Sequence, residues 1–279
     1  MTDAEADGAL NYALEVSYDG GPFSGWQSQL DGSGVQDALE RALHVLGERG
    51  GCGISLVPYR VDGAGRTDAG VHARAQVASV RLLKRWVPRK LAAALNAHLP
   101  EAVVVTRAAL APPGFHARRS AVSREYRYFI WNSPSCYPHI RRYVLWQPVA
   151  RYDWKRAAAA ASAFAGRHDF RAFCRARDVP DSTERDVYCS RLYVRGRLVV
   201  FRVIANAYLT NMVRIMAGSL MEIALGRFDE ARFARLLSGC ADRSENAPTP
   251  PPSGLFLWGV KYPDAIDWDP PDHLGKNPS

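Results

Sequence analysis

The first clear pattern in the chain is an alternation of apolar and polar positions. Within residues 12–18 the even-numbered side chains are all aromatic or aliphatic, and Ala13, Glu15 and Ser17 lie between them. This alternation predicts a strand with one buried face. After Gly20-Gly21, apolar residues recur at helical spacing over 35–46 and predict a helix. Ser33 and Gln36 have the spacing of a capping box at its start.

The same two periods recur along the rest of the chain. Short apolar runs predict strands, and longer runs with a spacing of three to four residues predict helices. In order, we expect a strand at 76–82, a helix at 88–98, a strand from 103, an aromatic strand at 126–131, an alanine-rich helix between Asp153 and Gly166, a hairpin over 192–203, helices at 212–223 and 230–237, and a strand at 255–260. Because strands and helices do not alternate strictly, the pattern favours an α+β fold.

A proline-rich turn divides this pattern into two halves. Pro112-Pro113-Gly114 is a strong turn signal. We therefore expect an N-terminal α+β half at 1–111 and a C-terminal α+β half at 112–279. Each half reads as a split β-α-β, or ferredoxin-like, unit with a largely antiparallel sheet. Two related units of this kind would flank a central cleft, and we expect the catalytic site there.

Composition and charge narrow the class of protein. The chain has 279 residues and a formal net charge of +8, and its excess of arginine suits contacts to phosphate and bases. The five cysteines are scattered without metal-ligand spacing, which is typical of reduced thiols in the cytosol. The first residues lack the basic and apolar regions of a signal peptide, and no apolar run reaches membrane-spanning length. We expect a cytoplasmic protein without a metal site.

The most informative stretch is the octapeptide Arg66-Thr67-Asp68-Ala69-Gly70-Val71-His72-Ala73. A guanidinium two residues away favours the ionised form of a carboxylate, so Asp68 could act as a nucleophile or a base. A structural pair of Arg66 and Asp68 in a turn explains the same pattern. His72 is more often a structural histidine than a base at such a position. The local pattern alone leaves both interpretations of Asp68 open.

Motifs of several other enzyme classes are absent from the sequence. The glycines near Asp68 form neither GxGxxG nor a Walker A motif, and neither a zinc-deaminase signature nor a GxSxG elbow is present. Arginines instead alternate with aromatic residues over 115–119 and 124–128, which fits contacts to RNA phosphates and unpaired bases. An ordinary strand with two faces explains this alternation equally well. Arg214 lies on an otherwise apolar helix and needs a partner, which Asp68 would supply.

Several motifs together resemble those of one family, the TruA-type tRNA pseudouridine synthases. They occur in the family's order over nearly the whole chain. These motifs are Tyr18-Asp19-Gly20, Gly25-Trp26-Gln27, Val35-Gln36, Gly65 to Ala73, Leu95-Asn96, Phe115-His116-Ala117-Arg118, Tyr126-Arg127-Tyr128, Asp169-Phe170 with Phe173, Asn211-Met212-Val213-Arg214 and Gly218 to Glu222.

The resemblance implies a specific reaction and site. The family isomerises uridine to pseudouridine at positions 38, 39 and 40 of the anticodon stem-loop of tRNA. It implies Asp68 as the nucleophile, Arg66 and Arg214 as active-site arginines, and Tyr126 as the residue that stacks on the target base. It also implies a homodimer that binds tRNA and works without a metal ion or organic cofactor.

Two departures and two alternatives remain beside this interpretation. Residues 47–59 look longer and richer in glycine than the family's segment, and Thr210-Asn211 stands where the family often has two histidines. A non-catalytic RNA-binding protein would share the charge and the aromatic residues but would not need Asp68. A nucleoside hydrolase would need a second carboxylate, for which Asp62 and Asp19 are weak candidates.

Overall fold

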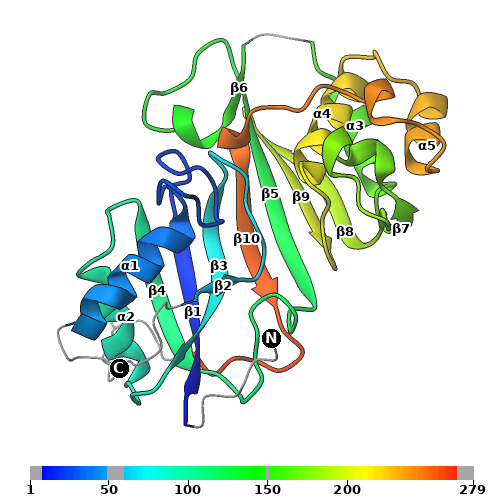
Figure 1. The fold of residues 1–279 in the computed structure, drawn as a ribbon. Helices are drawn as coiled ribbons and strands as arrows, with labels where there is room; N and C mark the ends of the chain where they lie inside the picture. Colours follow the sequence, from blue (N-terminus) through cyan, green and yellow to red (C-terminus); the bar gives the residue numbers. More distant parts are fainter. Residues whose placement is uncertain (1–7, 49–59, 149–150, 269–279) are drawn as a thin grey trace, which may run out of the picture. The chain divides into compact units, whose positions relative to one another are not determined.

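The computed structural model describes residues 8–48, 60–148 and 151–268 (Figure 1). The chain forms two compact units by its internal contacts. The first contains the described residues up to Val122 together with those from Gly259 onward, and the second runs from Ser123 to Trp258. The division therefore lies eleven residues after the predicted end of the first half at residue 111, and the chain returns to the first unit near its end.

The first unit is built on an antiparallel sheet with two helices. Its elements in chain order are β1 (Leu10–Tyr18), α1 (Val35–Glu48), β2 (Asp62–Gly63), β3 (His72–Leu82), α2 (Pro88–Asn96) and β4 (Val103–Leu110). The strands lie in the order β4-β1-β3-β2, and all three pairings are antiparallel. Each helix thus joins two strands that are separated by a third strand, which is inserted between them.

The two faces of this sheet are covered differently. Alternate side chains of β1, among them Tyr12, Leu14 and Val16, are fully buried on one face. The other face carries a small apolar cluster around Ala13 and Val77. The returning chain covers this cluster with residues 262–268, and residues 115–121 pack beside it. The cluster explains why residues from both ends of the described sequence belong to the first unit.

The second unit also combines a largely antiparallel sheet with helices. Its elements are β5 (Ser123–Asn132), β6 (Leu145–Gln147), α3 (Trp154–Ser162), β7 (Gly166–Asp169), β8 (Glu184–Arg195), β9 (Leu198–Ala205), α4 (Met212–Ala224), α5 (Glu230–Leu237) and the first part of β10 (Leu255–Lys261). The strand order is β10-β5-β9-β8-β7, and β5-β9-β8-β7 pair antiparallel. The helices α3, α4 and α5 gather on one side of β8 and β9 (Figure 1).

The predicted elements are present, and the largest differences lie at their ends. The carboxylate of Asp153 accepts two backbone N–H groups and caps α3 as expected, but the helix ends at Ser162, and Gly166 begins β7. The predicted capping box of α1 does not form. The Ser33 hydroxyl donates to the Asp31 carboxylate and lies 2.8 Å from the Ser24 hydroxyl, and the Asp37 carboxylate accepts the Gly34 N–H instead.

Candidate active site

Asp68 lies in the loop that connects β2 to β3 in the first unit. Within this loop the Arg66 side chain is exposed, Thr67 is buried, and Asp68 is half-buried. The Arg66 side chain therefore faces solvent, and Asp68 is partly accessible.

The backbone of this loop is held by partners from distant parts of the sequence. The Tyr18 hydroxyl lies 2.8 Å from Thr67 Oγ1 in a buried hydrogen bond, and the Trp26 N–H donates to the Thr67 carbonyl at 3.0 Å. The Val71 N–H donates to the Asp68 carbonyl at 3.1 Å and closes the turn after it. These bonds fix the peptide units on both sides of Asp68, so its carboxylate is presented by a rigid backbone.

Two glycines allow the β1–α1 connection to approach this loop closely. A Cβ atom at Gly20 would overlap the backbone of Val71. Gly25 has a φ of +106°, and a Cβ there would lie 2.6 Å from the Thr67 carbonyl oxygen. A larger residue at either position would push the loop away, which gives a physical reason for glycine in both resembling motifs.

His72 begins β3 directly after the loop and is almost completely buried. The Gly20 N–H donates to its Nδ1 at 3.0 Å, and Asp19 Oδ1 lies 3.1 Å from the same nitrogen. One nitrogen cannot accept and donate at once, so the proton on the ring decides which contact is a hydrogen bond. Both contacts tie β1 to β3, which agrees with a structural role for His72.

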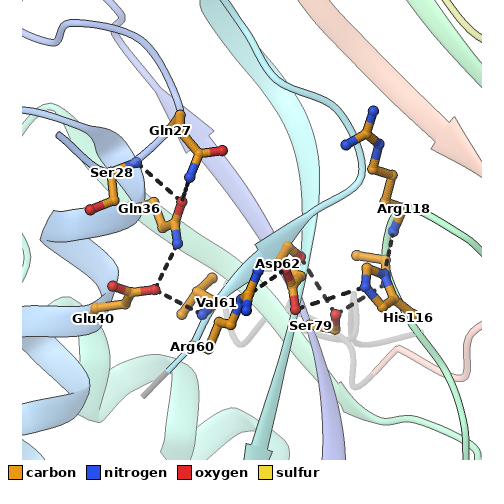
Figure 2. A network of polar contacts seen from close by, with 11 residues as sticks. Gln27, Ser28, Gln36, Glu40, Arg60, Val61, Asp62, Ser79, His116 and Arg118 are labelled. Atoms are coloured by element: carbon orange, nitrogen blue, oxygen red, sulfur yellow. Dashed lines mark hydrogen bonds and ion pairs between the residues drawn. The ribbon is translucent and has the colours of Figure 1, made fainter. Parts of the chain in front are cut away.

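A polar network holds β2 from the side of helix α1 (Figure 2). Glu40 Oε1 accepts the Val61 N–H at 2.9 Å and the Gln36 amide at 2.8 Å. Gln36 Oε1 in turn accepts the Gln27 side chain and the Ser28 N–H, both at 3.1 Å. The carboxylate of Glu40 therefore links the connection after β1 to the strand that leads into the Asp68 loop.

A second group of contacts holds β2 from the other side (Figure 2). His116 Nε2 lies 3.8 Å from Asp62 Oδ2, and Ser79 Oγ accepts the Ala117 N–H at 3.1 Å. The Arg118 N–H donates to His116 Nδ1 at 3.1 Å. Burial lowers the pKa of His116, the Asp62 charge opposes this, and Arg119 adds to the lowering. The exposed Arg118 and Arg119 are thus attached to the base of the Asp68 loop.

Tyr126 lies on β5 in the second unit and is largely buried, with 7% of its surface exposed. Its ring meets Tyr208 edge-on, with 4.9 Å between the ring centroids. The Tyr208 hydroxyl is bonded to the Arg124 and Val203 carbonyls, at 3.0 and 3.1 Å. Burial raises the pKa of Tyr208 well above its usual range, and Tyr126 adds to the increase. The Tyr126 ring is therefore fixed by a neutral, immobile neighbour.

Arg214 lies in the first turn of α4, where its guanidinium donates to a backbone carbonyl and to a side-chain amide oxygen. Nε donates to the Pro250 carbonyl and Nη1 to Asn211 Oδ1, each at 2.9 Å. Asn211, just before the helix, has a φ of +65° and is the one described residue other than glycine with a positive φ. The Arg214 charge also opposes the rise that burial causes in the pKa of Tyr128. Arg214 is thus oriented by a helix start with an unusual backbone and by a proline-rich loop.

The structure places the four predicted site residues in two groups. Arg66 and Asp68 share one loop of the first unit, whereas Tyr126 and Arg214 lie on β5 and α4 of the second. Sequence reasoning missed the oxygen partners of Arg214, because a proline carbonyl 36 residues away leaves no local signal. It also missed the glutamine on β3 that contacts the Asp68 loop, although its position in an apolar run was visible.

Comparisons with known proteins agree on one family. The model of the tRNA pseudouridine synthase family matches residues 15–118 and 160–263. The chain is 39% identical to tRNA pseudouridine synthase A of Pelobacter propionicus, over 89% of this chain and 98% of that protein. It is 42% identical to tRNA pseudouridine synthase A of Roseiflexus sp., over 91% of both chains. The corresponding protein of Mesorhizobium japonicum is 39% identical over 90% of this chain and 99% of its own.

The similarity to solved structures is much weaker. The structure of a Cbf5-Nop10-Gar1 complex matches with a TM-score of 0.34 and 14% identity, over 76% of this chain and 44% of that chain. Similarity at this level supports no argument about the site.

Proposed function

Because this chain belongs to the tRNA pseudouridine synthase family, a family of isomerases, we propose that it converts uridine to pseudouridine in tRNA. The observation that carries the proposal is the family match over residues 15–118, which contains the whole Asp68 loop and the residues that hold it. A half-buried carboxylate on a fixed backbone is the arrangement that attack on a bound nucleotide requires.

The reaction is an isomerisation, so its atoms balance without a cosubstrate. The C1′–N1 bond breaks, the uracil turns, and a C1′–C5 bond forms. The proton on C5 is released, and N1 gains a proton. Asp68 could attack C1′, where positive charge develops as in glycoside cleavage, attack C6 of the uracil, or remove a proton from the sugar. All three routes need the ionised carboxylate in contact with the nucleotide.

We assign the other site residues by the same reasoning. A base inside a stem must be flipped out of its stack before Asp68 can reach it. Arg66 would take the vacated space or contact a phosphate, which its exposure allows. Tyr126 would stack on the uracil during its rotation, and Arg214 would keep the Asp68 carboxylate ionised and oriented. These roles require Asp68, Tyr126 and Arg214 to act on one uridine.

We also propose that the two units are related split β-α-β halves on either side of a catalytic cleft. The support is the repeated strand order. In the first unit α2 connects β3 to β4 across β1, and in the second unit α4 and α5 connect β9 to β10 across β5. The boundary between these halves lies nearer residue 122 than the 111 expected from the proline turn.

The substrate positions, assembly and cellular location complete the proposal. The targets are uridines 38, 39 and 40 of the anticodon stem-loop, the active form is a homodimer, and the reaction takes place in the cytoplasm. No described helix is long and apolar enough to cross a membrane. Carbodiimide mapping of pseudouridine in tRNA from cells with and without the gene tests the positions. Loss of pseudouridine elsewhere, with positions 38–40 unchanged, would refute the assignment.

Substitution of Asp68 tests the reaction itself. Asp68→Asn keeps the shape of the side chain but removes its charge, so conversion in a tritium-release assay should fall by roughly 10⁴-fold or more. Binding of tRNA should persist, because phosphate contacts supply most of the affinity. Clear residual turnover would sink the nucleophile assignment.

Two matched variants separate this proposal from the alternatives. Asp62→Asn and Asp19→Asn alter the carboxylates that a nucleoside hydrolase would use as a second acid, and we expect both to retain most conversion. Release of free uracil by the parent protein would favour the hydrolase. Binding of tRNA by the parent protein without any formation of pseudouridine would favour a non-catalytic RNA-binding protein.

A further inference from the structure

A fully buried glutamine lies on β3 among apolar side chains. Gln76 pairs with Val16 and faces the same side of the sheet as Leu14 and Ala78, and all four residues are completely buried. Its Nε2 donates to the Gly65 carbonyl at 2.7 Å. Its Oε1 has no hydrogen-bond partner within the described part of the chain. Burying an amide in this way is unfavourable, because its Oε1 gives up hydrogen bonds to water and gains no hydrogen bond within the described part of the protein.

The hydrogen bond that the Gln76 amide donates is accepted by the first peptide group of the Asp68 loop. The Gly65 carbonyl belongs to the planar peptide unit that joins Gly65 to Arg66. A hydrogen bond that holds this oxygen therefore also fixes the direction of the backbone at Arg66. The next anchors act only at Thr67, through its hydroxyl and its carbonyl. Gln76 therefore holds the peptide at which the loop begins, and the Ala64 N–H, which donates to the Val77 carbonyl at 2.7 Å, holds the residue before it.

Packing alone does not explain the glutamine. A leucine or methionine would fill a similar volume on this apolar face and would remove the unsatisfied Oε1, but it would also remove the donor to the Gly65 carbonyl. The unfavourable burial is understandable if the bond from Nε2 has a task that an apolar side chain cannot perform.

We propose that Gln76 is a positioning residue for Arg66 and Asp68, acting through its N–H donor to the Gly65 carbonyl. Its effect on turnover rests on the proposed function, whereas its effect on the conformation of the loop does not. The donor holds the loop entry, and the bonds at Thr67 and Asp68 hold the rest.

The first test removes the donor and keeps the volume. Gln76→Met should fold and bind tRNA with nearly unchanged affinity, because the contacts to phosphates are kept. Its single-turnover rate should fall roughly 10–100-fold, since a catalytic group displaced by a fraction of its contact distance loses its alignment. Amide hydrogen exchange over residues 64–70 should be faster than in the parent protein. A rate within twofold of the parent and unchanged exchange would overturn the proposal.

The second test makes the donor depend on pH. In Gln76→Glu the protonated carboxyl group can donate to the Gly65 carbonyl, whereas the carboxylate cannot. Burial raises the pKa of such a group, so the rate should fall with increasing pH above the usual glutamate range, in a step that the parent lacks. A pH profile equal to that of the parent would show that the donor has no role. This result decides the proposal even if Gln76→Met does not fold.

A matched control removes a different buried and unsatisfied group. Ser190 on β8 is also buried, and its hydroxyl lacks a partner within the described residues. Ser190→Ala should leave both the rate and the exchange of residues 64–70 unchanged. If the parent protein forms no pseudouridine but Gln76→Met still accelerates this exchange, the proposed function fails and the positioning role stands. An equal loss of rate in Ser190→Ala would show that the effect is not specific to Gln76.

Discussion

Tyr126 combines two properties that can be separated by substitution. Its ring is fixed by the edge contact with Tyr208, and its hydroxyl is a polar group on a largely buried strand. If the ring stacks on the target base, the aromatic face matters and the hydroxyl does not. Base–aromatic stacking contributes about 1–3 kcal/mol per base.

Tyr126→Phe should therefore retain tRNA binding and most of the conversion, whereas Tyr126→Ala should bind tRNA more weakly and lose most of the conversion. Single-turnover rates and tRNA affinities of the two variants test this. Thermal unfolding serves as the control, because Tyr126→Ala also removes the contact with Tyr208. If the phenylalanine variant performs no better than the alanine variant, stacking is not the role of this residue.

The signature around Asp68 could be found from sequence, but most residues that hold it could not. Asp68 and Arg66 share a compact motif with its own glycine pattern. The Tyr18–Thr67 bond joins residues 49 positions apart, and only the folded sheet brings them together. The conformation of the Asp68 loop, with Arg66 exposed, depends on these distant bonds.

Helix α4 begins with a backbone conformation that residues other than glycine rarely adopt. Asn211 has a φ of +65°, which asparagine tolerates better than most residues and alanine tolerates poorly. Asn211→Ala should lower the free energy of unfolding by about 1–2 kcal/mol relative to Asn211→Gly. Both variants lose the oxygen that accepts from Arg214, so their conversion rates should fall together.

Urea unfolding and single-turnover kinetics of the Asn211 variants separate the two effects. Equal stability of the alanine and glycine variants would show that the backbone conformation is not strained. A normal rate in both variants would show that Asn211 does not orient Arg214.

The β5–β9 pair contains an ion cluster with a defined pH dependence. Glu125 accepts from Arg127 on its own strand and from Arg202 on β9, at 2.7 and 2.9 Å. Burial alone would raise the pKa of the Glu125 carboxyl group, but the hydrogen bonds from Arg202 and Arg127 outweigh this effect and lower the pKa. A carboxyl group whose pKa is lower in the folded state than in the unfolded state stabilises the fold fully at pH values above its unfolded-state pKa. This stabilisation is lost as the pH falls through its folded-state pKa.

The Glu125 contribution should thus be complete at neutral pH and disappear below the usual glutamate range. The stability of Glu125→Gln, measured by urea unfolding between pH 7 and pH 3, should depend less on pH than that of the parent. Equal pH dependence of the two proteins would show that this cluster does not contribute. The carboxylate is partly exposed, so we expect a modest difference.

The pattern of apolar residues was sufficient for the long elements and insufficient for the short ones. α4 and α5 were predicted because several turns repeat the same spacing and a cap or glycine marks the end. β2 has two residues and β6 three, too few for any period, and their pairing with β3 and β5 is decided by the rest of the sheet. The repeated order of strands could be suspected from sequence, but the pairings themselves come from contacts far apart in the chain.

The chain as a whole is proposed to act as a dimer. Sedimentation velocity at micromolar concentration should give twice the mass of one chain, and the species should persist when tRNA is added. The net charge of +8 makes tRNA binding depend on salt, so the measurement should be repeated at several salt concentrations. A monomer that retains full conversion at all concentrations would contradict the dimer.

The apolar cluster under the end of the described chain has a consequence for synthesis on the ribosome. The Tyr262 hydroxyl donates to the Ala117 carbonyl at 2.8 Å, and its ring packs against Phe115 at 5.1 Å between centroids. Tyr262 lies 145 residues after Ala117 in the sequence, so the ribosome synthesises it much later. The first unit to emerge from the exit tunnel must therefore wait with one face of its sheet uncovered until nearly all of the second has been made. During that interval the nascent polypeptide depends on chaperones or on its own partial compaction for protection.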